Sequence, residues 1–203
     1  SIEPNLLTDQ IIDLFARSEK FLPHFHIPLQ SGTDKILALM RRRYKRKVFQ
    51  NVVEYIREKI PLASVGTDII TGFPGENEED FQDTFSFMKN LPLSYFHVFT
   101  YSPRENTVAA ELPNRVPSEH ARKRNIQLHD LSAQKTLEFY RMNKGESRNV
   151  LFERKNKDGY YHGFTDNYIP VFVKAEDSLT NKIFRVQLQI LDDQKGMTGK
   201  ILL

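Results

Sequence analysis

The stretch SVGTDIITGFPGENEEDF, residues 64–81, decides the fold class of this chain. Its first eight residues are mostly β-branched or apolar, which is typical of a strand buried on both faces, as parallel strands under helices are. Pro74 and Gly75 then fit a type II turn, because proline presets φ and glycine accepts a positive φ. Asn77 is placed to cap a following helix. The stretch therefore predicts a strand, a tight turn and a helix, as in α/β proteins.

Similar units lie on both sides of this stretch. Apolar runs at 25–30 and 95–102 predict two more strands, and helices are expected over 7–21, 31–43, 47–60 and 118–143. In the helix over 47–60, Val48, Val52, Ile56 and Ile60 step by four along one expected buried face. Strands separated by helices pair in parallel through right-handed crossovers.

Three strands and their helices cannot close a barrel of six or eight strands. We therefore expect residues 1–143 to form an incomplete α/β barrel of parallel strands with open edges. Because the chain begins at Ser1 and not at Met, we interpret it as a fragment of a longer protein. Self-association through the exposed barrel edges is also expected.

The pattern changes after Gly145. Residues 146–203 contain five short β-rich runs, joined by turns such as 157–159 and 192–196. This spacing predicts a small antiparallel β-barrel of the OB-like kind, a fold that often binds oligonucleotides.

Composition excludes several classes of protein. The 203 residues include no cysteine, which excludes disulfides, thiolate catalysis and cysteine-ligated metal within this chain. No apolar run reaches the roughly 18 residues of a membrane span, and no signal peptide is recognisable. We expect a cytoplasmic protein without a membrane partner. A net charge of +3 indicates nucleic-acid binding only if the charge is clustered.

Three polar clusters follow the three predicted strands, at 30–32, 68–76 and 100–104. Strand ends on one rim are where α/β proteins bind ligands, although each cluster could also be an ordinary loop. The second cluster ends in carboxylates that would repel a phosphate from the helix N-terminus: Glu76, Glu78, Glu79 and Asp80. Main-chain groups at Gly72 and Gly75 could instead bind a base edge, and the acidic field predicts a cationic nucleoside.

His24 and His26 lie on one face of a predicted strand, an arrangement that some barrel hydrolases use for metal ligands. Asp68 or His97 would have to complete such a site. A purely structural histidine pair is the alternative.

Basic residues cluster in RRRYKRK, residues 41–47, and in the predicted small barrel. The first cluster could be a solvated helix end, or it could contact phosphates. Arg122, Lys123 and Arg124 add charge on the long helix, and tyrosines in the barrel add stacking surface, a combination that looped RNA favours. The predicted RNA-binding residues are Arg41, Arg42, Lys45, Arg46, Arg148, Arg154, Lys155, Lys157 and Tyr160.

The chain resembles the radical S-adenosylmethionine (radical SAM) methylthiotransferases. The resemblance is carried by SIEP (1–4), PHFHIPLQSGTDKILALMRRRY (23–44), TDIITGFPGENEEDF (67–81) and HVFTYSPRENTVAAELP (97–113), followed by a domain resembling TRAM, a small RNA-binding barrel. With the forms SIEP and PHFHIPLQSG, and with Asn106 where relatives acting on isopentenyl-adenosine usually carry Gly, it is most similar to the branch that methylthiolates threonylcarbamoyladenosine beside the tRNA anticodon.

The resemblance implies a partial radical SAM barrel, with S-adenosylmethionine and two 4Fe-4S clusters as cofactors of the full-length protein. The cluster cysteines of the family, including a CxxxCxxC loop, are absent from this chain, so we expect them in N-terminal domains outside it and expect no turnover by the chain alone. The anticodon stem-loop of tRNA is the implied partner. A non-catalytic RNA-binding module and a metal-dependent hydrolase built on His24 and His26 are the alternatives.

The resemblance also assigns cofactor-binding positions to the predicted rim. Gln30 and Ser31 match the strand end that faces the ribose and methionine part of the cofactor, and Glu3 and Arg43 match polar positions near the methionine end. The positions that match the adenine-lining segments are Asp68, Ile69, Gly72, Gly75, Phe99 and Tyr101. No catalytic residue and no metal ligand is assigned within the chain.

Overall fold

A computed structural model describes residues 1–190 and 196–202, so most of the predicted turn at 192–196 lies outside the described residues. The first part contains α1 (Asp9–Arg17), β1 (His24–His26), α2 (Asp34–Leu39), α3 (Arg46–Lys59), β2 (Ser64–Thr71), α4 (Glu78–Asn90), β3 (Tyr95–Thr100), α5 (Val108–Glu111) and α6 (Ser118–Met142). The second part contains β4 (Ser147–Lys155), β5 (Tyr160–Thr165), β6 (Pro170–Lys174), β7 (Lys182–Ile190) and β8 (Met197–Ile201).

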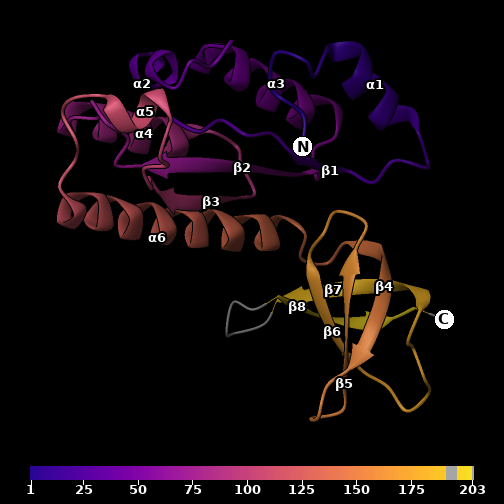
Figure 1. The fold of residues 1–203 in the computed structure, drawn as a ribbon. Coiled ribbons are helices and arrows are strands. Elements are labelled where there is room, and N and C mark those ends of the chain that lie inside the picture. The colour runs from indigo at the N-terminus through magenta and orange to yellow at the C-terminus, as the bar shows by residue number, and fades with distance from the viewer. Residues whose placement is uncertain (191–195, 203) are drawn as a thin grey trace.

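The first part is a parallel sheet in the order β1-β2-β3. In this register Gly66, in the middle strand, lies between His26 and Tyr95. Helices α1 to α4 cover one face of the sheet, and α6 runs along β3 (Figure 1). The predicted α/β arrangement of parallel strands is confirmed for the described residues.

The decisive stretch folds as its sequence predicts. Gly75 has φ +89 in the turn after β2, and the Glu76 N–H donates to the carbonyl of Phe73 at 3.0 Å. Asn77 forms a complete capping box with Asp80 at the start of α4. These contacts fix where the chain leaves the sheet.

The buried face of α3 differs from the prediction. Val52 and Ile56 are buried as expected, but Val48 is 38% exposed and Phe49 and Val53 enter the core in its place. Side chains at i, i+3, i+4 and i+7 share one helical face, so Phe49, Val52, Val53 and Ile56 form a wider stripe than a strict step of four.

One open edge of the sheet is covered by the chain itself. Ser132 of α6 donates its hydroxyl to the carbonyl of Phe96 at 2.7 Å and accepts the Phe96 N–H at 2.9 Å. On the other side, the Ile2 N–H reaches the carbonyl of His26 at 3.3 Å. The predicted self-association through sheet edges stays a prediction, with less bare edge than the sequence suggested.

The second part is a closed barrel in the order β4-β5-β6-β8-β7, which confirms five strands. It is not wholly antiparallel, because β6 and β8 pair in parallel through Val171 with Met197 and Phe172 with Thr198. A closed ring with an odd number of strands cannot alternate direction at every seam, so one parallel pair is a geometrical necessity.

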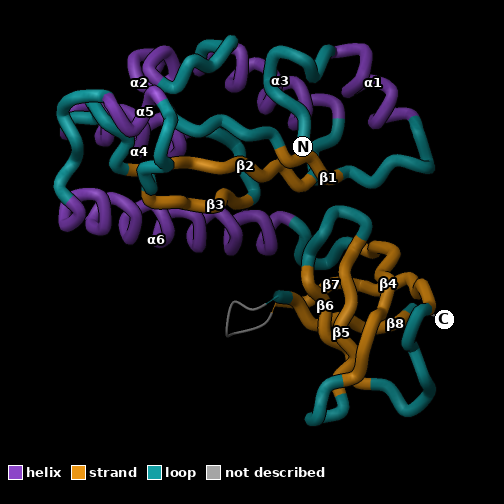
Figure 2. The backbone as a smooth tube through the Cα atoms, viewed as in Figure 1, coloured by secondary structure: helices purple, strands orange, loops and turns teal. Residues whose placement is uncertain are grey.

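The barrel lies beyond the C-terminal end of α6 (Figure 2). The buried amide of Asn167 joins the two parts, since its Nδ2 donates to the carbonyl of Leu62 at 2.8 Å and to Oδ1 of Asn143 at 2.9 Å. None of the helices among the described residues has the length and apolarity of a membrane span.

Candidate functional site at the open face and strand ends

The face of the sheet away from α1 to α4 carries polar and aromatic side chains. Phe25, Val65 and Phe96 belong to the core on the helix side. Side chains alternate along a strand, so the neighbours of these residues point to the other face. The open-face residues are His24, His26, Asp68, Ile70, Tyr95, His97 and Phe99.

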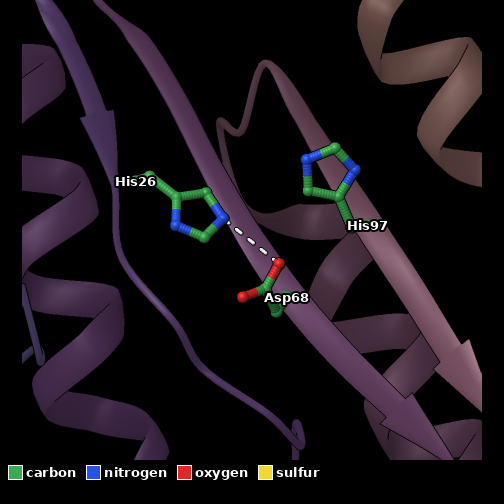
Figure 3. Close-up of side chains that lie close together, drawn as sticks. All are labelled: His26, Asp68 and His97. Atoms are coloured by element: carbon green, nitrogen blue, oxygen red, sulfur yellow. Dashed lines mark hydrogen bonds and ion pairs between the residues drawn. The ribbon is translucent and has the colours of Figure 1, made fainter. Parts of the chain in front are cut away.

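Three of these side chains converge from three neighbouring strands (Figure 3). Nε2 of His26 lies 3.1 Å from Oδ1 of Asp68, and one ligand atom each from His26, Asp68 and His97 lie within 4.8 Å of one another. Two imidazoles and a carboxylate at this spacing can bind a divalent metal or hydrogen-bond a polar ligand.

His24 and His26 share one face of β1, as the sequence predicts, but His24 lies outside the cluster of His26, Asp68 and His97. His24 Nε2 lies 3.0 Å from the Tyr95 hydroxyl, and its ring stacks on Tyr168 of the barrel. Burial lowers the pKa of His24, helped by the nearby His26, and burial also raises the pKa of Tyr95 to about 12. His24 therefore serves the contact between the two parts of the chain, and Asp68 and His97 take its expected place beside His26.

A pocket of about 460 Å³ opens at the carboxyl ends of β2 and β3. Its walls include Ile70, Phe99, Tyr101 and Arg104. The Tyr101 hydroxyl is buried and has no hydrogen-bond partner among the described residues. An apolar wall with an unused hydroxyl suits a ligand of nucleoside size. Phe99 and Tyr101 are thus placed together, as the sequence predicts.

Ile70, and not the predicted Ile69, places its side chain at the pocket. The Ile69 side chain is fully buried among the core residues under the helices, so it cannot line a ligand on the open face. Ile70 points to the open face and lines the pocket. Alternation along the strand from Asp68 is the signal that identifies Ile70.

Gln30 extends the sheet beyond β1. Its N–H donates to the carbonyl of Asp68 at 2.8 Å, its carbonyl accepts the Ile70 N–H at 2.9 Å, and its φ is +77. A left-handed backbone at a residue other than glycine is uncommon and often marks a functional site. Ser31, which follows, is only 1% exposed, and its hydroxyl lies 3.4 Å from the Thr33 amide.

The glycine turn uses its own amides. The Gly72 N–H donates to Oε2 of Glu76 at 2.7 Å, and the Gly75 N–H donates to the carbonyl of Asn114 at 3.0 Å. A Cβ on Gly72 would lie 2.6 Å from Cβ of Ala121, so this glycine permits the close approach of α6. Neither amide is left to bind a base edge.

The expected acidic field is partly offset from within. Glu76 is 6% exposed, and its carboxylate receives Nη1 of Arg124 at 2.8 Å, while Nη2 of Arg124 reaches Glu78 at 3.1 Å. Asp80 is paired with Lys35 at 2.6 Å, and Glu79 is exposed. Burial raises the pKa of Glu76, and the Gly72 amide and Arg124 oppose this rise. Arg124, expected to add positive charge for RNA on the long helix, is instead buried against this turn.

The basic segment 41–47 begins directly after Met40, the C-cap of α2, and runs into the first residues of α3, so the helix-end alternative holds for Arg41. Arg42 contacts Glu3 with a nitrogen to oxygen distance of 3.5 Å, whereas Arg43, assigned with Glu3 to the methionine end, is exposed. Arg46 donates to the carbonyl of Gly32 at 3.1 Å and pairs with Asp83 at 2.7 Å. Both Arg42 and Arg46 therefore support the fold of the loop. Arg41 and Lys45 remain exposed.

The basic residues of the barrel also divide into one that is held within the fold and others that are exposed. Arg148 is held by Oδ1 of Asn143 at 3.0 Å and Oδ1 of Asp166 at 2.8 Å, so it belongs to the joint with α6. The remaining predicted residues of the barrel are exposed at the hairpin between β4 and β5: Arg154, Lys155, Lys157 and Tyr160. This hairpin keeps the charge and the aromatic surface that RNA contacts need.

The comparisons with known proteins agree with this architecture. The model of the radical SAM superfamily matches residues 1–88. The threonylcarbamoyladenosine tRNA methylthiotransferase MtaB of Aquifex aeolicus is 42% identical over 162 residues, 80% of this chain and 38% of that relative. The tRNA-2-methylthio-N(6)-dimethylallyladenosine synthase of Carboxydothermus hydrogenoformans is 37% identical over 187 residues, 91% of this chain and 42% of that relative.

The chain belongs to the radical SAM methylthiotransferase family. It spans about two fifths of the length of the curated relatives that it matches. Coproporphyrinogen III oxidase (HemN) from Escherichia coli, described as a radical SAM enzyme, is similar with a TM-score of 0.53 over 92% of this chain and 45% of that chain. At 14% identity this likeness shows the fold alone.

The radical SAM family implies S-adenosylmethionine and iron–sulfur clusters. The pocket beside Tyr101 fits a nucleoside, through its apolar wall and the unpartnered hydroxyl. An iron–sulfur cluster does not fit the residues of this chain, which has no cysteine to hold one.

Proposed function

We propose that this chain is the cofactor-facing half-barrel and the tRNA-binding domain of a radical SAM tRNA methylthiotransferase. The full-length protein would add a methylthio group to C2 of threonylcarbamoyladenosine beside the tRNA anticodon. The observation that carries this proposal is the similarity to tRNA methylthiotransferases, which extends over 80% to 93% of the chain and so includes both the sheet and the barrel. Two such relatives are named for threonylcarbamoyladenosine.

In this proposal the strand-end pocket receives the adenosyl part of S-adenosylmethionine, with Ile70 and Phe99 as its apolar wall. The free hydroxyl of Tyr101 donates or accepts a hydrogen bond within it. Gln30 and Ser31 are proposed to face the ribose of the cofactor. The roles proposed for Glu3, Arg43 and Asp68 are those that the family resemblance implies. When bound, S-adenosylmethionine supplies the radical chemistry, and the residues of this chain bind and orient it.

The barrel is proposed to bind the anticodon stem-loop through the β4–β5 hairpin. Lys155, Lys157 and Arg154 supply charge for phosphates and Tyr160 supplies a stacking surface. The strand order of the barrel and its single parallel seam support the OB-like, TRAM-type assignment.

The decisive experiment uses the full-length protein that contains this chain. It is expressed in a host that makes threonylcarbamoyladenosine and dimethylallyladenosine but lacks their methylthiotransferases, and tRNA nucleosides are measured by mass spectrometry. We expect a methylthio group on threonylcarbamoyladenosine and a loss of product in the Tyr101→Ala variant. A product only on dimethylallyladenosine would overturn the proposed substrate, and no methylthio nucleoside would overturn the proposed function.

The hydrolase alternative loses its original basis, because His24 contacts Tyr95 and not a shared metal site with His26. The cluster of His26, Asp68 and His97 is proposed to contact the polar part of the ligand on the open face. The alternative of a non-catalytic RNA-binding protein predicts no methylthio nucleoside in the same measurement on the full-length protein.

A further inference from the structure

A second pocket lies where the barrel meets the sheet, apart from the strand-end pocket. Its volume is about 390 Å³, and its walls include Tyr95 and His97 of β3, Phe139 of α6, and Phe164 and Tyr168 of the barrel. The pocket is therefore lined by both parts of the chain and is dominated by rings. Its size is sufficient for one nucleobase.

Tyr168 is presented to this pocket in an unusual way. It is 55% exposed and has φ +67, a backbone region that bulky side chains avoid. Its turn is held by the Tyr168 N–H, which donates to the carbonyl of Thr165 at 3.0 Å, and by the Ile169 N–H, which donates to the Thr165 hydroxyl at 2.8 Å. A strained position that is this firmly held points to a function for the exposed ring.

The neighbouring residue fixes the turn to the rest of the molecule. Asn167 is fully buried and donates to Leu62 from the sheet part and to Asn143 after α6. The position of Tyr168 is thus set by both parts of the chain. A rigid aromatic side chain costs little conformational entropy when a ligand binds, which favours a recognition role.

Other aromatic side chains contact Tyr168 from both parts of the chain. Tyr168 stacks on His24 at 4.7 Å and on Phe164 at 4.9 Å between ring centroids, and Phe164 contacts His162 at 4.9 Å. Phe164, His162 and Tyr160 alternate along β5, so they lie on one outward face that leads to the basic hairpin. The pocket and the positive charge are therefore joined by one strand.

We propose that this junction pocket receives one unpaired base of the bound RNA, which packs against the ring of Tyr168. The phosphates of that strand follow the outward face of β5 toward Lys155 and Lys157. Aromatic stacking beside a basic track is how single-stranded and looped RNA is recognised without base pairing. The inference rests on the proposed function, because it takes RNA as the ligand.

The test measures the binding of the 203-residue chain to a fluorescently labelled RNA hairpin with an anticodon stem-loop sequence. Tyr168→Asn removes the ring and keeps a residue that tolerates positive φ. Tyr168→Phe keeps the ring, and Ile183→Ala removes another exposed apolar side chain of the barrel, 66% exposed on β7. Each loop nucleotide of the RNA is then replaced in turn by an abasic nucleotide.

We expect Tyr168→Asn to weaken binding of the intact RNA by about 5- to 150-fold, and Tyr168→Phe and Ile183→Ala to leave it within twofold. At one loop position, the abasic RNA should bind the wild type and Tyr168→Asn with equal affinity, because the base and the ring act together. Equal weakening by Tyr168→Asn on every abasic RNA would overturn the inference and make the ring a contact between the two parts of the chain.

Two further outcomes separate the inference from the proposed function. Binding of the intact RNA that is insensitive to Tyr168→Asn would overturn the junction pocket and leave the proposed function standing. Failure of the wild type to bind any of the RNAs would remove the tRNA-binding role and the inference together. Thermal unfolding of each variant confirms that its fold is kept.

Discussion

The buried ion pair between Glu76 and Arg124 gives the sharpest stability prediction. Arg124 is 5% exposed and donates to the Glu76 carboxylate at 2.8 Å, to the Glu76 carbonyl at 3.2 Å and to Glu78 at 3.1 Å. Arg124→Met removes the guanidinium, whose Cζ lies 5.4 Å from the centroid of the Phe81 ring, and leaves the Glu76 charge in the core with the Gly72 amide as its remaining donor. Breaking a buried pair in this way costs about 3–5 kcal/mol.

The cost converts into a measurable change. In a protein of this size each kcal/mol shifts the melting temperature by about 2–4 °C, so Arg124→Met should lower it by about 6–20 °C. The assays are thermal unfolding for the melting temperature and urea unfolding for the free energy, both followed by circular dichroism of the helices. Arg122→Met is the matched control, since Arg122 lies on the same helix and is exposed.

A double-mutant cycle isolates the pair. Glu76→Gln removes the charge that Arg124→Met strands, so the double variant should be less destabilised than the sum of the two single variants by about 0.5–3 kcal/mol. Two results would refute the reasoning: a loss for Arg124→Met no larger than that for Arg122→Met, or strictly additive losses. If Arg124 contacted phosphate, its removal would instead weaken RNA binding without changing stability.

Three further outcomes are expected. Lys155→Ala and Lys157→Ala should each lower the salt dependence of RNA binding by about 0.7–0.9 in slope, measured by anisotropy over a salt series, and an unchanged slope would exclude their phosphate contacts. Gly72→Ala should cost about 1–3 kcal/mol in urea unfolding, because φ is +77 and the new methyl group would meet Ala121, and a neutral result would contradict that contact. The pKa of His24 is lowered by burial, so the unfolded chain binds a proton more readily and the free energy of unfolding should fall as pH drops through 6.5. His24→Gln should make the free energy of unfolding depend less on pH, measured as urea midpoints at acidic and neutral pH. A stronger pH dependence in this variant would show that the pKa of His24 is shifted in the opposite direction.

The parts of the fold that the sequence predicts are local. The strand, turn and helix over 64–81 follow from residues within a few positions of one another, including the capping box of Asn77 and Asp80. The pairing of Glu76 with Arg124 joins residues 48 positions apart, and no local pattern indicates it. The predicted acidic field therefore leaves out the charge of Arg124, which offsets part of it.

The predicted cofactor-binding residues also differ in whether a local pattern identifies them. Phe99 and Tyr101 share a face by strand alternation, and both line the strand-end pocket. Ile69 has the opposite parity to Asp68, so its side chain belongs to the core and only its main chain is left for the proposed site. The convergence of His26, Asp68 and His97 needs the register of three strands, which the sequence does not contain.

The presence of Asn106, which the sequence comparison took as a sign of substrate preference, has a simpler physical explanation. Its φ is +61, a left-handed backbone that glycine and asparagine adopt at little cost. An exchange of Gly for Asn at this position keeps the turn and needs no change of ligand. The proposed preference for threonylcarbamoyladenosine therefore rests on the relatives and not on this residue.

The basic residues illustrate how charge in a sequence divides between fold and ligand. Arg42, Arg46 and Arg148 matched the RNA-binding pattern, yet each donates to a carboxylate or amide oxygen within the chain. Arginine has five donors in a fixed fork, which suits it to such multiple contacts, whereas lysine is a single point charge. Lys155 and Lys157 are exposed at the β4–β5 hairpin. The RNA-binding role should therefore concentrate at this hairpin, and not in the more strongly charged segment 41–47.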